Sequence, residues 1–188
     1  MRKLPDGSDF HTLPFIHDLA TDTYVGDSFD IAVYLDQTYP ESGPPLFSER
    51  SLGLQRAFNA QVDALFTRFV VLSVDGMPFN PTSAEETKVE HARRFGVAHW
   101  DDFAVRGDAR VRMLEEFKAA MEEFARFYRN EDEGPFLEGS RITYADFIVG
   151  GWLAMLKETF AEWEDFCKWQ GSKWRRLHEA LNEWRVIR

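Results

Sequence analysis

The sequence PFIHDLATDTYVGDSFDIAVYLDQTYP, residues 14–40, begins with two short runs of residues that favour strands. Phe15–His17 and Thr23–Val25 are rich in β-branched and aromatic side chains, and the segment 18–22 between them has the composition of a turn. Two such runs joined by a short turn predict a β-hairpin.

The same stretch continues as a predicted helix. Its apolar residues fall on one helical face, namely Phe29, Ile31, Ala32 and Leu35. Either Asp27 or Ser28 stands where an N-cap residue is expected. Pro40 ends the helix, because the residue before a proline avoids helical backbone.

Residues 51–188 read almost entirely as helix. One apolar stripe at helical spacing comprises Leu54, Phe58, Val62, Leu65, Phe66, Phe69 and Val70. A second stripe, with Asp108 as its expected cap, comprises Val111, Leu114, Phe117, Met121, Phe124 and Tyr128. Ser83 with Glu86 predicts a capping box at the helix between them, and a last helix is expected from Lys173 to about Trp184.

The sharpest local signal is the segment around Thr143. Thr143 is a favourable N-cap residue, and Asp146 lies three residues later, where its carboxylate can accept from the cap's own N–H. The helix that follows is apolar on all sides, so we expect it to be the buried helix of a bundle.

We therefore predict an α+β fold that is mostly α. A β-hairpin plus helix, residues 1–47, precedes an all-α helical bundle, residues 48–188, and the linker PESGPPLF spans residues 40–47.

The composition argues against several classes of protein. The 188 residues include 17 Phe and 6 Trp, enough to build a hydrophobic core. The net charge of −10 argues against a nucleic acid or an anionic membrane as partner. No apolar run reaches the roughly 18 residues of a membrane span, and the N-terminus does not read as a signal peptide. One cysteine fits a reducing compartment, so we expect a cytoplasmic protein.

Three segments carry a family resemblance. TLPFIHD (12–18) and VGDSFDIAVYLDQTYP (25–40) resemble the glutathione-site half of the N-terminal domain of glutathione S-transferases. FLEGSRITYADFIV (136–149) is similar to the capping-box motif of that family's helical C-terminal domain. TLPFIHD together with ARRFG (92–96) is most similar to a fungal class related to bacterial β-etherases.

The resemblance implies a partial thioredoxin-like domain that binds glutathione through Leu13, Pro14, Asp27 and Ser28. Pro14 is expected to be cis, which would leave the main chain of Leu13 to pair with the cysteine of glutathione. Ser28 and the first N–H groups of its helix suit the γ-glutamyl carboxylate, and Asp27 suits the amine. Simpler interpretations stay open: Pro14 opens an edge strand, and Asp27 or Ser28 only caps the helix.

The first strand, helix and strand of that family's N-terminal domain match no segment of this chain. The Ser, Cys or Tyr that activates the glutathione thiol is therefore unknown. Either the sequence is a piece of a complete transferase, which we favour because the glutathione residues are present, or it is a non-catalytic remnant. Without activation, a thiol of pKa ~8.5 stays mostly protonated near neutral pH.

Other candidate residues are weaker. Cys167 has acidic and aromatic neighbours, which disfavour a catalytic thiolate. Four tryptophans lie at helical spacing and are expected to pack in the core rather than line a substrate pocket: Trp163, Trp169, Trp174 and Trp184. The histidines lack the spacing of a metal site, so no metal is expected.

We expect a glutathione S-transferase-like protein. It would conjugate glutathione to a small hydrophobic electrophile, or use it to cleave an ether, if the thiol-activating segment exists. The alternative is a non-catalytic binding or scaffold protein of the same fold. The expected partners are glutathione as co-substrate, a small hydrophobic substrate and a second copy of the chain in a homodimer.

Overall fold

The computed structural model describes residues 13–48, 50–129 and 133–185. The chain forms two compact units, Met1–Asn59 and Ala60–Arg188. The boundary between them lies inside helix α2 (Leu52–Phe69). The predicted division into domains after residue 47 stays a prediction.

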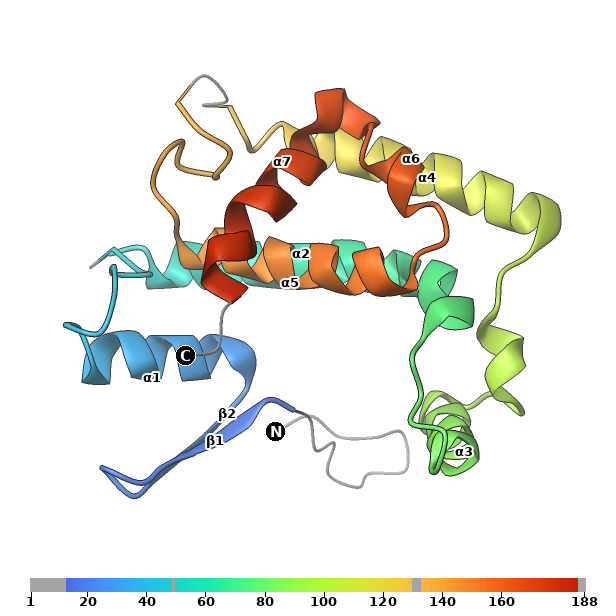
Figure 1. The fold of residues 1–188 in the computed structure, drawn as a ribbon, viewed down its shortest axis with the longest axis horizontal. Helices are drawn as coiled ribbons and strands as arrows, with labels where there is room; N and C mark the ends of the chain where they lie inside the picture. Colours follow the sequence, from blue (N-terminus) through green and yellow to red (C-terminus); the bar gives the residue numbers. More distant parts are fainter. Residues whose placement is uncertain (1–12, 49, 130–132, 186–188) are drawn as a thin grey trace. The chain divides into compact units, whose positions relative to one another are not determined.

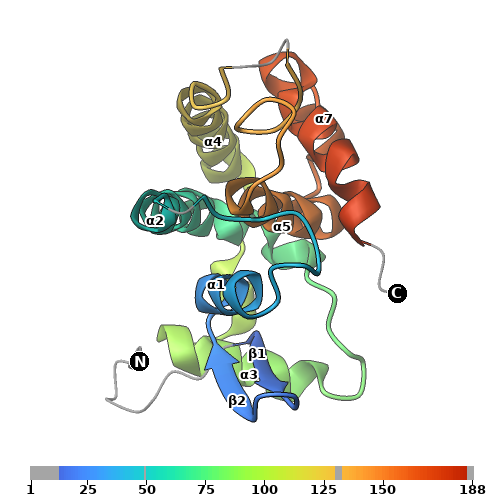
Figure 2. The ribbon, with the colours of Figure 1, turned by 90° about the vertical axis from the view of Figure 1, so that its left-hand side faces the viewer.

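The first unit contains the predicted hairpin and helix (Figure 1). Strand β1 (Phe15–Asp18) pairs antiparallel with β2 (Thr23–Gly26), and α1 (Ser28–Thr38) follows directly. Figure 2 shows the two strands side by side below α1, which is seen end-on. Phe29 in the first turn of α1 is buried against Phe47, whereas Leu35, further along the predicted apolar face, is 41% exposed.

The second unit is helical. After α2 it contains η1 (Val70–Gly76), α3 (Ala84–Phe95), η2 (Trp100–Phe103), α4 (Gly107–Ala125), α5 (Tyr144–Thr159), α6 (Trp163–Phe166), η3 (Trp169–Ser172), α7 (Lys173–Ala180) and η4 (Leu181–Arg185), where η marks a 3₁₀ helix. Helices α2 and α5 run side by side in Figures 1 and 2. Trp152 joins them, since its ring stacks on Phe66 and its Nε1–H donates to Asp63 at 3.2 Å.

An aromatic cluster around Phe117 of α4 forms the centre of the helical unit. Phe117 is 1% exposed. Its ring contacts five others, those of Phe66, Phe69, Phe160, Phe166 and Trp169. Edge-to-face and offset contacts of this kind add to the free energy of burial, so α2, α4 and the α5–η3 segment fold onto one core.

The predicted cap at Thr143 is confirmed. The Thr143 N–H donates to Oδ2 of Asp146 at 2.9 Å, and the Leu137 N–H donates to Oδ1 at 2.7 Å. Asp146 is fully buried, and burial raises its pKa. One carboxylate therefore satisfies the start of α5 and the loop before it.

Two other predicted caps are wrong in detail. Ser83 is the N-cap of α3, but its side chain makes no capping hydrogen bond. Helix α4 starts earlier than expected, with Arg106 as N-cap and Asp108 inside the first turn. Asp108 is also favourable inside the first turn, because an acidic side chain there interacts well with the helix dipole.

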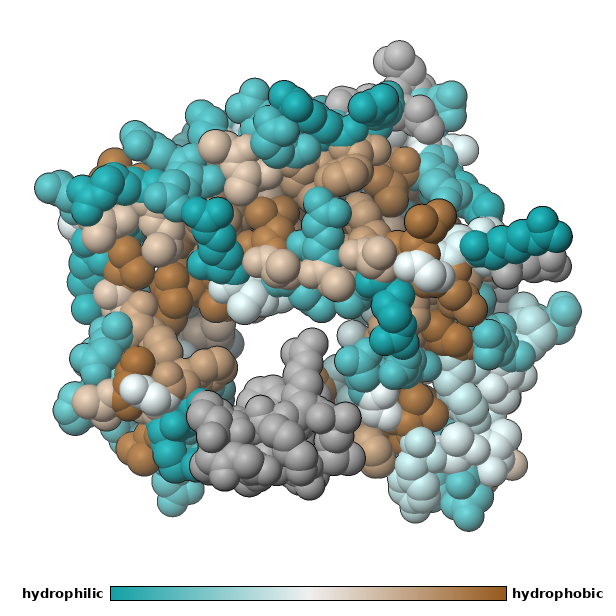
Figure 3. Space-filling model, turned by 180° about the vertical axis from the view of Figure 1, so that it is seen from behind, coloured by the Kyte–Doolittle hydropathy of each residue, from teal (hydrophilic) through white to brown (hydrophobic). Residues whose placement is uncertain are grey.

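Both apolar stripes begin with an exposed residue and are buried further along the helix. Val62, Phe66 and Phe69 are buried, whereas Leu54 is 75% and Val111 is 55% exposed. Seen from behind, brown apolar side chains reach the surface in patches between teal hydrophilic ones (Figure 3). Single exposed apolar residues are normal on protein surfaces, so these positions lie outside the core without implying a partner.

One segment of the described chain, Leu52–Gly76, is long and apolar enough to cross a membrane by length and composition alone. Core helices of soluble proteins pass the same test. The buried residues Val62, Phe66, Phe69 and Leu72 give this segment a core-facing side within the chain itself. The observation is therefore weak evidence for a membrane span.

Candidate functional site

The register of the hairpin brings the two halves of the predicted site together. Phe15 pairs with Gly26, so the residues just outside this pair, Pro14 and Asp27, lie at the same end of the hairpin. Residues paired across antiparallel strands have Cα atoms about 5 Å apart. The Leu13–Pro14 peptide bond is cis, as expected, and the Leu13 side chain is 89% exposed.

Asp27 is the residue that caps α1, which settles the choice between Asp27 and Ser28. Its Oδ1 accepts from the Phe29 N–H at 3.0 Å, and its carbonyl accepts from the Ile31 N–H at 2.9 Å. Its backbone has φ 71° and ψ 127°, a conformation that residues other than glycine rarely adopt. Such strained positions persist where the surroundings fix them, and they cluster at functional sites.

The second oxygen of the cap, Oδ2 of Asp27, has no hydrogen-bond partner among the described residues. Ser28, the first helical residue, is exposed, as is Asp27. An exposed carboxylate oxygen and hydroxyl beside the first N–H groups of a helix can bind a group that carries both an amine and a carboxylate. The family resemblance implies the same pair of groups, an amine and a carboxylate, at this end of the hairpin.

The opposite end of the hairpin is tied to the end of α1. Oδ2 of Asp18 accepts from the hydroxyls of Tyr34 at 2.6 Å and Tyr39 at 2.5 Å. These hydrogen bonds lower the pKa of Asp18 to about 2. No local sequence pattern marks this cluster, because Asp18 has the character of an ordinary turn residue and Tyr34 and Tyr39 lie 16 and 21 residues further along the chain. The cluster joins the turn end of the hairpin to α1.

Sequence analysis also missed two residues beside the predicted site. Asp30 lies in the first turn of α1, and Arg56 from α2 pairs with it. The Arg56 guanidinium lies 4.5 Å from the centre of the Phe29 ring. Their separation of 26 residues leaves no local pattern that could have paired them.

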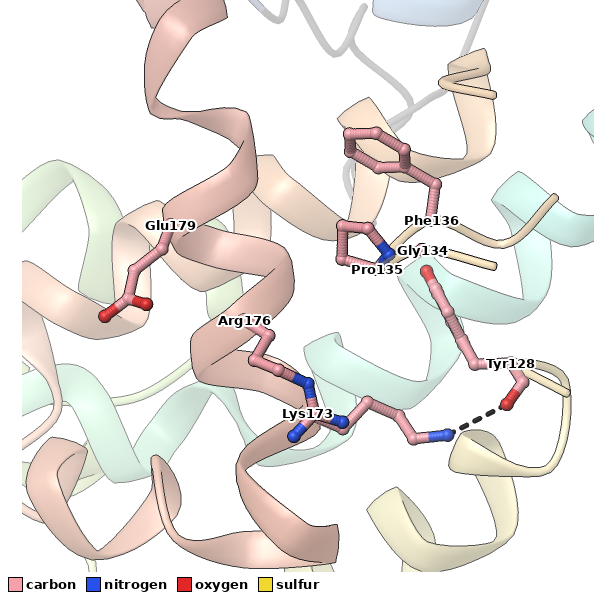
Figure 4. A pocket seen from close by; sticks show the side chains of 7 residues that line it. All are labelled: Tyr128, Gly134, Pro135, Phe136, Lys173, Arg176 and Glu179. Carbon is pink, nitrogen blue, oxygen red and sulfur yellow. Dashed lines mark hydrogen bonds between the residues drawn. The ribbon is translucent and has the colours of Figure 1, made fainter. Parts of the chain in front are cut away.

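A pocket of about 350 Å³ lies in the helical unit between the end of α4, residues 134–136 and α7 (Figure 4). Lys173 extends along it and donates to the carbonyl oxygens of Ala125 at 3.2 Å and Tyr128 at 2.9 Å. This buried lysine therefore caps the C-terminal end of α4. Burial raises the pKa of Tyr128 well above its ordinary value, so the phenol stays neutral. The pocket is thus lined by a lysine that caps a helix, a neutral phenol and the charged side chains of Arg176 and Glu179.

Cys167 and Trp174, two of the weaker candidate residues, are buried in the core. Cys167 is 1% exposed, and burial raises the pKa of its thiol. Trp174 is fully buried, as expected for a core residue, whereas Trp184 is 43% exposed. Within residues 13–48, 50–129 and 133–185, no group of three or more His, Cys, Asp or Glu side chains could hold a metal ion.

Comparison with known proteins gives this geometry a family. A glutathione S-transferase of Ceriporiopsis subvermispora, crystallised in complex with glutathione, is 28% identical with a TM-score of 0.84, over 100% of this chain and 76% of that chain. A second one from the same organism, also in complex with glutathione, is 26% identical with a TM-score of 0.81, over 96% and 74%.

The glutathione S-transferase-like protein ustS of Aspergillus flavus is 30% identical over 168 residues, which cover 84% of this chain. The match spans 60% of the length of that relative. The family model described as "Glutathione S-transferase, C-terminal domain" matches residues 53–184. Since that match covers most of the chain, this protein belongs to the glutathione S-transferase family.

Proposed function

We propose that this glutathione S-transferase-like protein binds glutathione at Leu13, Pro14, Asp27 and Ser28. The observation that carries the proposal is the hairpin register, which sets Leu13–Pro14 beside Asp27–Ser28 in a member of this family. Two similar structures, both over 25% identical, hold glutathione, which supports the same ligand here.

Each residue has a role that fits its geometry. The main chain of Leu13 pairs with the cysteine backbone of glutathione, as an added strand would. The Ser28 hydroxyl and the first N–H groups of α1 bind the γ-glutamyl carboxylate, because helix N-termini favour anions. Oδ2 of Asp27 binds the neighbouring amine while Oδ1 continues to cap the helix.

Calorimetric titration of the purified chain with glutathione tests the proposal. We expect Asp27→Asn and Ser28→Ala each to weaken binding about tenfold, since a hydrogen bond to a charged group contributes about 1.5 kcal/mol or more. Asp22→Asn, at the turn end of the same hairpin, should leave binding unchanged. Equal affinity in all four proteins would contradict the site.

Glutathione would serve as co-substrate for conjugation to a small hydrophobic electrophile or for ether cleavage. By the family resemblance, conjugation needs a group that activates the thiol. Among residues 13–48 and 50–59, the hydroxyl beside the proposed site is that of Ser28, which is already assigned to the carboxylate. The second candidate function is therefore binding without turnover. Conjugation of a generic aryl halide by this chain above the uncatalysed rate would favour the enzyme; binding without conjugation would favour the second candidate.

A homodimer and a cytoplasmic location complete the proposal. Both come from the family resemblance and the single cysteine. Analytical ultracentrifugation at micromolar concentration should give the mass of two 21.9 kDa chains, and a monomer at all concentrations would contradict dimerisation.

A further inference from the structure

The N-terminal end of α1 carries two carboxylates of its own. Asp27 caps the helix and Asp30 lies inside its first turn. Both side chains stabilise the helix start through its dipole. The proposed function, on which this inference rests, brings a third carboxylate, that of the γ-glutamyl group, to the same turn. The amine of that group pairs with Asp27, so Asp30 is the carboxylate whose charge opposes the incoming one.

Arg56 lies where it can offset that repulsion. Its guanidinium is hydrogen-bonded to Oδ1 of Asp30, and it stacks at 4.5 Å from the centre of the Phe29 ring. Phe29 is 3% exposed and is itself fixed by an edge contact with Phe47 at 5.5 Å. The arginine is therefore held at the first turn from two directions, by a charge and by a buried ring.

We infer that Arg56 is a positioning residue that neutralises Asp30 so that the first turn of α1 accepts the γ-glutamyl carboxylate of glutathione. The arginine acts through Asp30 and does not touch the peptide. The pair is half exposed, with side-chain accessibilities of 61% for Arg56 and 50% for Asp30. Water and salt screen exposed charges, so the effect is modest and depends on ionic strength.

A double-mutant cycle separates this role from direct contact. We expect Arg56→Met to raise the dissociation constant for glutathione about fourfold, as suits an exposed charge pair. Asp30→Asn in the same chain should restore the original affinity, because the repelling charge is then gone. If the double variant binds as weakly as Arg56→Met, Arg56 contacts glutathione directly and the inference is overturned.

The chain offers a matched control on the same helix. Arg68 lies 4.9 Å from the Phe69 ring and pairs with Glu116 at 2.7 Å, with a side-chain exposure of 62%. It is about 18 Å from Arg56 along α2, at 1.5 Å per residue. Arg68→Met should leave the dissociation constant unchanged. A fourfold rise there as well would overturn the inference, since a general effect of charge removal would explain both.

Two further readouts exclude a merely structural role. The difference between Arg56→Met and the original chain should vanish near 1 M salt, where the screening length is about 3 Å. Cysteinylglycine, which lacks the γ-glutamyl group, should bind both proteins equally. A difference that persists in either measurement would overturn the inference, whereas failure of the unaltered chain to bind glutathione would overturn the proposed function itself.

Discussion

The Asp18 carboxylate accepts a hydrogen bond from the Tyr39 hydroxyl and so joins the turn of the hairpin to the end of α1. The hydroxyl of Tyr34 donates to the same oxygen. These contacts hold one end of the hairpin, and the residues of the proposed glutathione site lie at the other. The structural and the proposed binding functions of the hairpin are therefore separated along its length.

We expect this contact to be stable between about pH 4 and pH 10. The pKa of Asp18 falls from 3.8 to about 2, so its contribution is complete above the higher value and is lost as the pH drops toward the lower one. The pKa of Tyr39 rises from 10.0 to about 12, so its contribution is lost as the pH rises across that interval. Hydrogen exchange of the β1 and β2 amides measures the contact.

Asp18→Asn is the corresponding variant. In this variant, hydrogen exchange of the β1 and β2 amides should no longer show the acid transition between about pH 4 and pH 2, because an amide side chain does not titrate there. Asp36→Asn, in the last turn of α1, is a control that should keep the transition. An acid transition that is unchanged in Asp18→Asn would show that another group controls it.

Asp146→Ala should lower the free energy of unfolding by about 3 kcal/mol, because buried N–H donors lose their acceptor. The affected donors are the main-chain N–H groups of Leu137 and Thr143. Chemical denaturation of the purified protein measures the loss. Asp165→Ala, which removes an exposed pair with Lys168, should change stability by less than about 0.5 kcal/mol. Equal losses would argue against a special role of the buried carboxylate.

Gly76 and Gly53 should respond oppositely to alanine. A Cβ at Gly76 would lie 2.1 Å from the carbonyl oxygen of Thr159, whereas a Cβ at Gly53 would have open space. Gly76→Ala therefore forces η1 away from the end of α5 and should destabilise by about 2 kcal/mol or more. Gly53→Ala, in α2, should stabilise by up to about 1 kcal/mol. Thermal unfolding compares the two, and the same sign for both would contradict the close approach.

Asp27→Gly should separate the fold from the binding of glutathione. Glycine adopts the φ of 71° without strain and replaces an N-cap at a cost of only a few tenths of a kcal/mol. The variant should unfold at nearly the original temperature yet bind glutathione about tenfold more weakly, because the charge-assisted partner of the amine is lost. Unchanged affinity would mean that Asp27 serves only the helix.

Local patterns predicted the hairpin, α1, α5 and the capping box, because each depends on neighbouring residues. Asp146 illustrates this, since its spacing from Thr143 is visible in the sequence. Long-range partners were out of reach, as with Asp30 and Arg56, which meet across a loop. Helix starts were misplaced where several residues could cap, as at Arg106. Pro14 and Asp27 lie at the same end of the hairpin because of its strand register, and the sequence alone leaves that register open.

The burial of Cys167 has a practical consequence. It is the only cysteine in the sequence, and its thiol is shielded. A cysteine introduced at an exposed position such as Ser42, on the loop after α1, would then react with a maleimide dye while the native thiol stays silent. Fluorescence from that single attached dye could follow ligand arrival at the hairpin unit in real time.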